Sequence, residues 1–330
     1  MRIGAACMLL HPDGEKIADH NMRTTTVAKV ATLDSESRLS WIREVVNSNL
    51  ATLENQIRFV GALPPELRLF RISSGLLPLF THPIAAAFYA GIADTENRIN
   101  RLKELGILAR SLDVRLSFHP GQFVVLGSQT QRIRENAIKE LQYHCDVFTD
   151  MGYAGWHDHG IAVNVHVGPK DAAVKEMREL IANAPENLQN FLTLENDEYS
   201  WGTARITETF GDMVAIVLDI HHHWINAHSR LEHSDPLVKS VKSTWRGVQP
   251  KLHHAMSHPE MCTSSKELHL DTLLSNGYTK SKLRAHTLEP WNNDVNKYAL
   301  GFGFDVMWEG KNKNLGALQL YDLHKANVSK

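Results

Sequence analysis

The stretch Met213-Val-Ala-Ile-Val-Leu-Asp219 is apolar over six residues and then ends on a carboxylate. A second stretch, Ile161-Ala-Val-Asn-Val-His166, is almost as apolar and ends on an imidazole. Runs of this kind are typical of parallel strands whose two faces are both covered. They predict an α/β fold with a buried parallel sheet.

Working outward from these two runs, short apolar segments alternate with longer amphipathic ones along the whole chain. The expected strands are Arg2–Met8, Leu67–Ser73, Arg115–His119, Ile161–Val167, Phe191–Glu195, Val214–Asp219, Lys251–Ala255 and Phe302–Trp308. The expected helices include Ser40–Leu63, Glu96–Leu112, Ile133–Met151, Ala172–Ala184, Thr203–Phe210, Pro236–Gly247 and Lys266–Asn276.

This alternation predicts parallel strands joined by right-handed crossovers. Eight such units predict closure into a single (β/α)8 barrel, and the length of 330 residues suits one barrel with insertions. We therefore expect one domain over residues 1–330. Within it, Met22–Ser37 is expected to be a long loop over the barrel mouth, and Lys311–Lys330 a weak terminal helix or a short tail.

Composition sets further limits. The content of 43% hydrophobic and 22% charged residues is typical of a soluble globular protein. The chain has no secretory signal, no apolar run near the roughly 18 residues that span a membrane, and only three cysteines, so we expect a cytoplasmic protein. The net charge of −2 does not announce nucleic acid, although residues 239–330 carry a basic surplus that suits either a phosphate-binding wall or a solvated helical face.

Most of the expected strands end on a side chain that can bind a metal. These side chains are His119, His166, Glu195, Asp219, His253 and Glu309, and the loop after the second strand adds His82. In an α/β barrel all strands end on one face, where active sites are built. Crowded carboxylates and imidazoles there would suffer repulsion and desolvation unless cations balanced them.

The mixture of carboxylates and imidazoles suits Mn²⁺, Zn²⁺ or Fe²⁺ better than Ca²⁺. So many candidates predict two or three ions per chain, with Mn²⁺ favoured and Zn²⁺ or Mg²⁺ as alternatives. Two ions about 3.5–4 Å apart can activate water and stabilise both oxygens of a phosphoryl displacement. A lone histidine at a strand end is more often structural, so the prediction depends on the set.

The remaining histidines are predicted either to face the site or to lie elsewhere. Side chains alternate along a strand, so within His221–His223 we expect His222 to face the site. We expect surface or capping positions for His11, His20, His144, His157, His159, His228, His233, His286 and His324.

At His119-Pro-Gly-Gln-Phe123 and Glu195-Asn-Asp197 the chain resembles the ultraviolet damage endonuclease family, a relative of metal-dependent apurinic endonucleases and xylose isomerases. The resemblance runs from Met1 to about Asn314. Its other pieces are Phe80-Thr-His82-Pro83, Leu126-Gly-Ser128, Val165-His166-Val-Gly168, Leu218-Asp219-Ile-His-His222, Pro250-Lys251-Leu-His253 and Asp305-Val-Met-Trp-Glu309. It implies a xylose-isomerase-like barrel that nicks DNA immediately 5′ of a pyrimidine photoproduct, leaving a 3′-hydroxyl and a 5′-phosphate.

The resemblance also implies roles for individual residues. It implies metal ligands at His82, His119, His166, Glu195, Asp219, His222, His253, His269 and Glu309. It implies catalytic roles for Glu195, Lys251, His253 and Glu309, with Lys251 matching a lysine that can be carboxylated beside the metals. Gln122 and Phe123 match residues that probe the damaged base pair. The implied partner is damaged double-stranded DNA, and we expect a monomer without a nucleotide cofactor.

Two positions depart from the family pattern. The family usually has a tyrosine in the first strand, where this chain has Ala5, and commonly a tyrosine where this chain has Phe123. Phenylalanine can still wedge between bases and stack on them. The range of lesions therefore does not follow from the resemblance, whereas the metal ligands are unaffected.

Two other functions fit parts of the pattern. A sugar or sugar-phosphate isomerase could use the same barrel, but that class usually needs fewer metals and a compact pocket. A non-catalytic protein that only binds lesions would tolerate the loss of Glu195.

Overall fold

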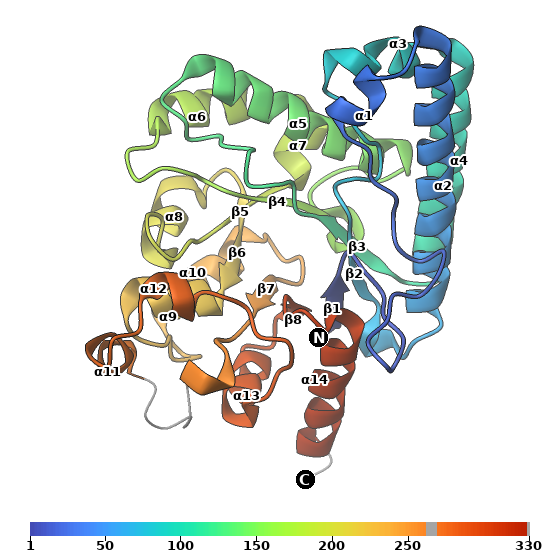
Figure 1. The fold of residues 1–330 in the computed structure, drawn as a ribbon. Helices are drawn as coiled ribbons and strands as arrows, with labels where there is room; N and C mark the ends of the chain where they lie inside the picture. Colours follow the sequence, from blue (N-terminus) through green and yellow to red (C-terminus); the bar gives the residue numbers. More distant parts are fainter. Residues whose placement is uncertain (262–268, 329–330) are drawn as a thin grey trace.

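Eight parallel strands close into one barrel, with each strand paired to the next in sequence and β8 paired to β1 (Figure 1). The computed structural model describes residues 1–261 and 269–328. The strands are β1 (Ile3–Ala6), β2 (Leu69–Ile72), β3 (Arg115–Phe118), β4 (Ala162–His166), β5 (Leu192–Glu195), β6 (Ala215–Asp219), β7 (Lys251–His254) and β8 (Asp305–Trp308). The expected (β/α)8 fold is confirmed, with each expected strand present and trimmed at its ends.

Helices surround the barrel. Those expected from the sequence are α2 (Ser35–Gly61), α4 (Ile92–Ser111), α5 (Gln131–Asp150), α6 (Val174–Ala182), α8 (Thr203–Phe210), α10 (Pro236–Thr244) and α11 (Leu270–Ser275). Further helices are α1 (Val27–Ala31), α3 (Ala86–Tyr89), α7 (Glu186–Phe191), α9 (Ile220–Ala227), α12 (Lys280–Leu283), α13 (Asn293–Gly301) and α14 (Lys313–Val328). The expected helix Lys266–Asn276 lies partly outside the described residues.

Two expected irregular segments turn out to contain helices. Met22–Ser37 is not simply a loop, because it holds α1 and the start of α2. The side chain of Thr26 accepts a hydrogen bond from the backbone N–H of Lys29, and that of Asp34 accepts one from Ser37, so both helices have capped N-termini. Of the two alternatives for Lys311–Lys330, the structure has the helix: α14 packs on β1 and buries Ala317 and Leu320.

Burial follows the helical and strand patterns of the sequence. All five residues of β6 are buried, as expected for a strand covered on both faces. In α2 the buried residues Ile42, Val46, Leu50 and Leu53 recur every three or four positions, which places one stripe of the helix against the barrel.

The amino ends of the strands contain buried charged residues that pair with each other. At the amino ends of the strands, Arg115 and Asp305 form a buried ion pair of 2.8 Å. Arg115 also donates to the carbonyls of Gly160 and Gln249.

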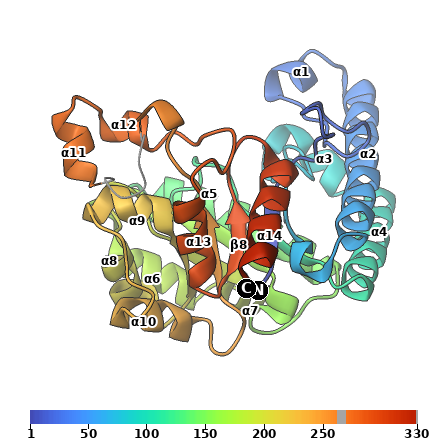
Figure 2. The ribbon, with the colours of Figure 1, turned by 90° about the horizontal axis from the view of Figure 1, so that it is seen from below.

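Figures 1 and 2 place α1–α4 on one side of the barrel and α9, α11 and α12 on the other. In the described part of the chain, no helix has the length and apolar character needed to cross a bilayer.

Candidate metal centre

The carboxyl ends of neighbouring strands bring the predicted ligands together. In the barrel register, His166 of β4 lies beside Glu195 of β5, and Asp219 of β6 lies beside His253 of β7. His119 directly follows β3 and Glu309 directly follows β8. The sheet itself therefore sets the relative positions of these side chains.

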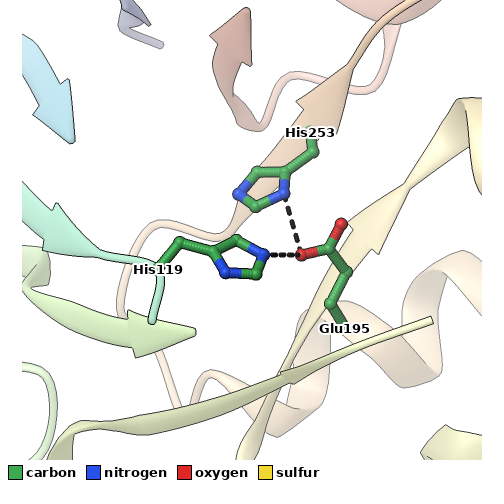
Figure 3. Close-up of side chains that lie close together, drawn as sticks. All are labelled: His119, Glu195 and His253. Atoms are coloured by element: carbon green, nitrogen blue, oxygen red, sulfur yellow. Dashed lines mark hydrogen bonds and ion pairs between the residues drawn. The ribbon is translucent and has the colours of Figure 1, made fainter. Parts of the chain in front are cut away.

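Glu195 lies at the middle of the cluster and is only 1% exposed. Its Oε2 is 3.2 Å from Nε2 of His119 and 3.0 Å from Nδ1 of His253 (Figure 3). Its Oε1 is 3.6 Å from Nδ1 of His222. One carboxylate therefore faces imidazoles from three different elements.

The potential ligand atoms form three groups in which all members lie within 4.8 Å of one another. The groups are His119 with Glu195 and His253, His166 with Glu195 and His222, and Asp219 with His253 and Glu309. Because Glu195 and His253 each belong to two groups, neighbouring ions would share ligands.

Several buried atoms in these groups lack any hydrogen-bond partner among the described residues. They are Oε1 of Glu195, Oδ2 of Asp219 and Nδ1 of His166. Buried polar atoms are normally hydrogen-bonded. Orphaned acceptors and imidazole nitrogens that face one another are what a divalent cation requires, so the residues present fit the predicted metal.

Charge in the cluster is strongly perturbed. Burial raises the pKa of Glu195, but the neighbouring imidazoles of His253 and His166 outweigh it and hold the pKa well below the usual range. Burial also raises the pKa of Glu309, but Arg71 and His253 outweigh it and hold that pKa well below the usual range. Burial raises the pKa of Asp219 well above its usual value, since His222 compensates it only in part.

The pKa values of the imidazoles are shifted in both directions. Burial lowers the pKa of His253 to about 4, which leaves the ring neutral and able to bind a metal. Burial also lowers the pKa of His222, but Asp219 and Glu195 outweigh it and raise the value to about 9. In the metal-free protein His222 therefore serves as a counter-charge.

The position of His222 has a different origin from the one expected. His221–His223 lie in helix α9, not on a strand, so the alternation argument was wrong, although His222 does face the cluster. Asp219 caps α9 by accepting a 2.7 Å hydrogen bond from the backbone N–H of His222. The rings of the other two point elsewhere: His221 lies 3.1 Å from the carbonyl of Leu283, and His223 lies 2.8 Å from the Thr203 hydroxyl.

Asparagines brace the carboxylates. Asn196 donates to the carbonyl of Asp219 (2.9 Å) and accepts from its N–H (2.8 Å), which ties the ends of β5 and β6 together. Asn164 donates from Nδ2 to Oε2 of Glu195, and Thr193 donates to Oδ1 of Asn164 over 2.9 Å. Such outer contacts fix the orientation of the ligands.

Two predicted ligands lie apart from the three groups. His82 is exposed, and its Nδ1 accepts a 3.1 Å hydrogen bond from the N–H of Ile84. His269 is exposed and precedes α11. Neither joins a group of ligand atoms among the described residues.

Lys251 lies at the start of β7, only 1% exposed, and its Nζ has no hydrogen-bond partner in the described part of the chain. Burial, helped by the charges of Arg115 and Arg71, holds the pKa of Lys251 well below its usual value. Burial therefore favours the neutral form of this amine.

The predicted DNA-probing residues lie in the loop after β3. Gln122 and Phe123 are both exposed, and Phe123 is 72% exposed, which is unusual for so large an apolar side chain. Ala5, in place of the family's tyrosine, is buried within β1. It pairs with Phe70 on one side and Trp308 on the other.

The sequence analysis missed three neighbours of the cluster. Arg71 donates to Oε1 of Glu309. Oε2 of Glu198 lies 3.8 Å from Nε2 of His222. Nδ1 of His286, which was expected at the surface or at a cap, lies 4.0 Å from Oε2 of Glu309. Arg71 left a readable signal, because it is a charged residue inside an apolar strand, Leu69-Phe-Arg-Ile72.

Two histidines expected at the surface or at caps are fully buried, and of the two His157 does stand at an N-cap, that of the short 3-10 helix Asp158–Gly160. His144 donates from Nδ1 to the carbonyl of Glu140 over 2.7 Å, and His157 donates to that of Ile161 over 2.8 Å. Both satisfy one ring nitrogen on the backbone, which lets a neutral imidazole be buried.

Comparison with known proteins places the chain among its relatives. The family model of UV-endonuclease UvdE matches residues 1–329. The UV DNA damage endonuclease of Bacillus cereus (strain B4264) is 27% identical over 315 residues, covering 91% of this chain and 88% of that protein. That of Bacillus anthracis is 28% identical over 312 residues, covering 90% and 87%.

Solved structures share the fold. SacUVDE has a TM-score of 0.75 at 22% identity and covers 99% of both chains. Endonuclease IV from Thermus thermophilus has a TM-score of 0.53 at 12% identity, covering 83% of this chain and 94% of that one. Since the family model spans almost the whole chain, the protein belongs to the UV-endonuclease UvdE family.

Proposed function

We propose that the protein is a metal-dependent DNA repair endonuclease that cuts the backbone immediately 5′ of an ultraviolet photoproduct or a related lesion. The products would be a 3′-hydroxyl and a 5′-phosphate. One observation carries the proposal: buried, unpartnered ligand atoms surround Glu195 at the mouth of the barrel in a member of a UV-endonuclease family. The family offers no support for the sugar isomerase alternative.

The cofactor we propose is a set of two or three divalent ions, with Mn²⁺ favoured and Zn²⁺ or Mg²⁺ as alternatives. When bound, such ions lower the pKa of a water molecule and stabilise the oxygens of an in-line phosphoryl displacement. The shared carboxylate of Glu195 and the rings of His119, His166 and His253 would hold them. His82 and His269 remain ligand proposals, with the resemblance as their support.

Lys251 is proposed to act beside the ions. A buried neutral amine is the form that can react with CO₂, forming an N–C bond and releasing a proton, and the product carries two oxygen donors. This change would place an anion where the unmodified lysine leaves an unpartnered amine.

Damaged double-stranded DNA is the proposed partner. Phe123 would wedge beside the lesion and Gln122 would reach the bases, because both side chains are exposed in the same loop. Stacking would stabilise nucleotides displaced from the duplex. We further propose that the protein acts as a monomer in the cytoplasm and needs no nucleotide cofactor.

A nicking assay tests the proposal. Metal-free protein and protein loaded with Mn²⁺ are incubated with irradiated, abasic and undamaged duplexes, and the ends of the fragments are identified. Cleavage immediately 5′ of the lesion, by the loaded protein only, is expected. Glu195→Gln should lose nicking and keep DNA binding, whereas a loaded wild-type protein that leaves both damaged duplexes intact would refute the proposal.

A further inference from the structure

Arg71 is the one guanidinium that touches the predicted ligands within the described residues. It lies in the interior of β2, beside Ala6 of β1 and Ser117 of β3, and is 8% exposed. Its side chain reaches past β1 to the carboxyl ends of β7 and β8. Nη2 donates to Oε1 of Glu309 and lies 3.1 Å from Nε2 of His253.

These contacts fall on two members of one group of ligand atoms, the group formed by Asp219, His253 and Glu309. Oε1 of Glu309 is also the oxygen that lies 3.2 Å from Nδ1 of His253. A carboxylate oxygen has more than one lone-pair direction. The bond from Arg71 therefore leaves Oε1 able to bind a cation together with His253.

Glu309 depends on this bond for its orientation. Among the described residues, Arg71 is the only hydrogen-bond donor to the Glu309 carboxylate. Glu309 lies beyond the end of β8, and its side chain is 12% exposed; besides Arg71 it faces the imidazoles of His253 at 3.2 Å and of His286 at 4.0 Å, and neither makes a hydrogen bond to it. Glu195 differs, because Asn164 and His119 both bond to its Oε2.

We propose that Arg71 is a positioning residue of the metal centre, which holds Glu309 against His253 so that the two residues present ligand atoms to the same ion. This inference rests on the proposed function. A guanidinium is suited to the task because it remains charged at all relevant pH values and has a rigid planar fork.

The charge of Arg71 also has an opposing effect, since it repels a cation nearby. Orientation and repulsion change metal affinity in opposite directions, so the sign of the change separates them. Orientation prevails here because Glu309 has no second donor within the described part of the chain. Loss of Arg71 should therefore weaken metal binding.

Arg115 supplies a matched control. It too is a buried arginine that reaches a carboxylate of β8, at 2.8 Å from Asp305. Its pair belongs to none of the three groups of ligand atoms. Replacing Arg115 therefore removes a buried ion pair without removing a contact to Asp219, His253 or Glu309.

The test titrates metal-free wild type, Arg71→Met, Arg71→Lys and Arg115→Met with MnCl₂ by calorimetry, and records Tm and nicking as a function of Mn²⁺. We expect Arg71→Met to weaken Mn²⁺ binding by about 10- to 100-fold, and excess Mn²⁺ to restore nicking. Arg71→Lys should weaken binding less, because it keeps the charge but loses the fork. Arg115→Met should lower Tm and leave Mn²⁺ affinity unchanged.

Equal or tighter Mn²⁺ binding by Arg71→Met would overturn the inference, as would an equal loss of affinity in Arg115→Met. If Arg71→Met does not fold, Arg71→Lys decides, and an affinity equal to that of the wild type would overturn the inference. A wild-type protein that binds no Mn²⁺ would overturn the proposed function and the role of Arg71 with it. Bound Mn²⁺ without nicking would count against the function alone.

Discussion

The two ends of this barrel hold the same kind of buried charge pair, used in opposite ways. At the amino ends of the strands, Nη1 of Arg115 pairs with Asp305 and also donates to the carbonyl of Gln249, and Nε donates to the carbonyl of Gly160. At the carboxyl ends, Arg71 pairs with Glu309, but Glu195 and Asp219 beside them keep unpartnered carboxylate oxygens. At the first end both oxygens of Asp305 accept hydrogen bonds, one from the N–H of Arg2 and one from Arg115, whereas the second end keeps unpartnered carboxylate oxygens that suit a cation.

The sharpest contrast should come from neutralising one carboxylate at each end. Glu195→Gln removes the ligand shared by two groups, so nicking should fall by more than about 100-fold, because even outer-contact substitutions cost 10- to 100-fold. Measured rates on an irradiated duplex check this. Asp305→Asn is the control, and a comparable loss of rate in folded Asp305→Asn would break the distinction between the two ends.

Stability should show the reverse order. Asp305→Asn leaves Arg115 buried and unpaired, so the free energy of unfolding should fall by about 3–5 kcal/mol. Urea unfolding of metal-free protein measures it. Glu195→Gln should destabilise the metal-free protein less, because the amide oxygen can still accept from Asn164 and His119. A larger loss from Glu195→Gln would contradict this.

Acid should also lower the free energy of unfolding, through two buried histidines that lie outside the metal centre. Burial lowers the pKa of His157 to about 3 and that of His144 to about 4, both below the ordinary value of 6.5. The unfolded chain then binds more protons, so the stabilisation is complete above pH 6.5 and is lost as the pH falls toward 4, by about 3 kcal/mol for each histidine. Urea midpoints of metal-free protein between pH 7 and 4 check the slope. His144→Gln should make it shallower, and an unchanged slope would contradict the assignment.

Removal of metal should act on the carboxyl end alone. A ligand that binds only the folded state at 100 times its Kd stabilises it by about 2.7 kcal/mol, so a chelator should lower the free energy of unfolding by about that amount. Paired urea curves with EDTA and with Mn²⁺ measure the difference. The same difference is expected in Arg115→Met, and its disappearance there would show that the two ends are coupled.

The smallest effect should come from Phe123, in the loop after β3, and should concern the affinity for DNA. Phe123→Ala should weaken binding to irradiated duplex by about 1–3 kcal/mol, the amount that stacking on one base contributes. Fluorescence anisotropy measures the affinity. Ile107→Ala, which truncates another exposed apolar side chain on the outer helix α4, is the control and should leave affinity unchanged.

Much of the site was predictable from sequence patterns because most of the strands end on a side chain that can bind a metal. The eight strands were predictable because a strand covered on both faces must be apolar, and His166, Glu195, Asp219 and His253 were predictable because parallel strands end on one face. The secondary structure of His221–His223 was not predictable by alternation, because Asp219 caps a helix at that point and ends the strand pattern.

By itself, then, the sequence determined the barrel, the face that carries the chemistry, and the donor types, since each depends on local periodicity and on the last residue of a strand. Only the tertiary structure decided that Arg71 reaches Glu309 across 238 residues, and that His144 and His157 are buried. It also decided that His82 and His269 lie apart from the donor groups of the described residues. Those outcomes depend on side-chain directions and on helix packing across the barrel, which no local pattern in one chain encodes.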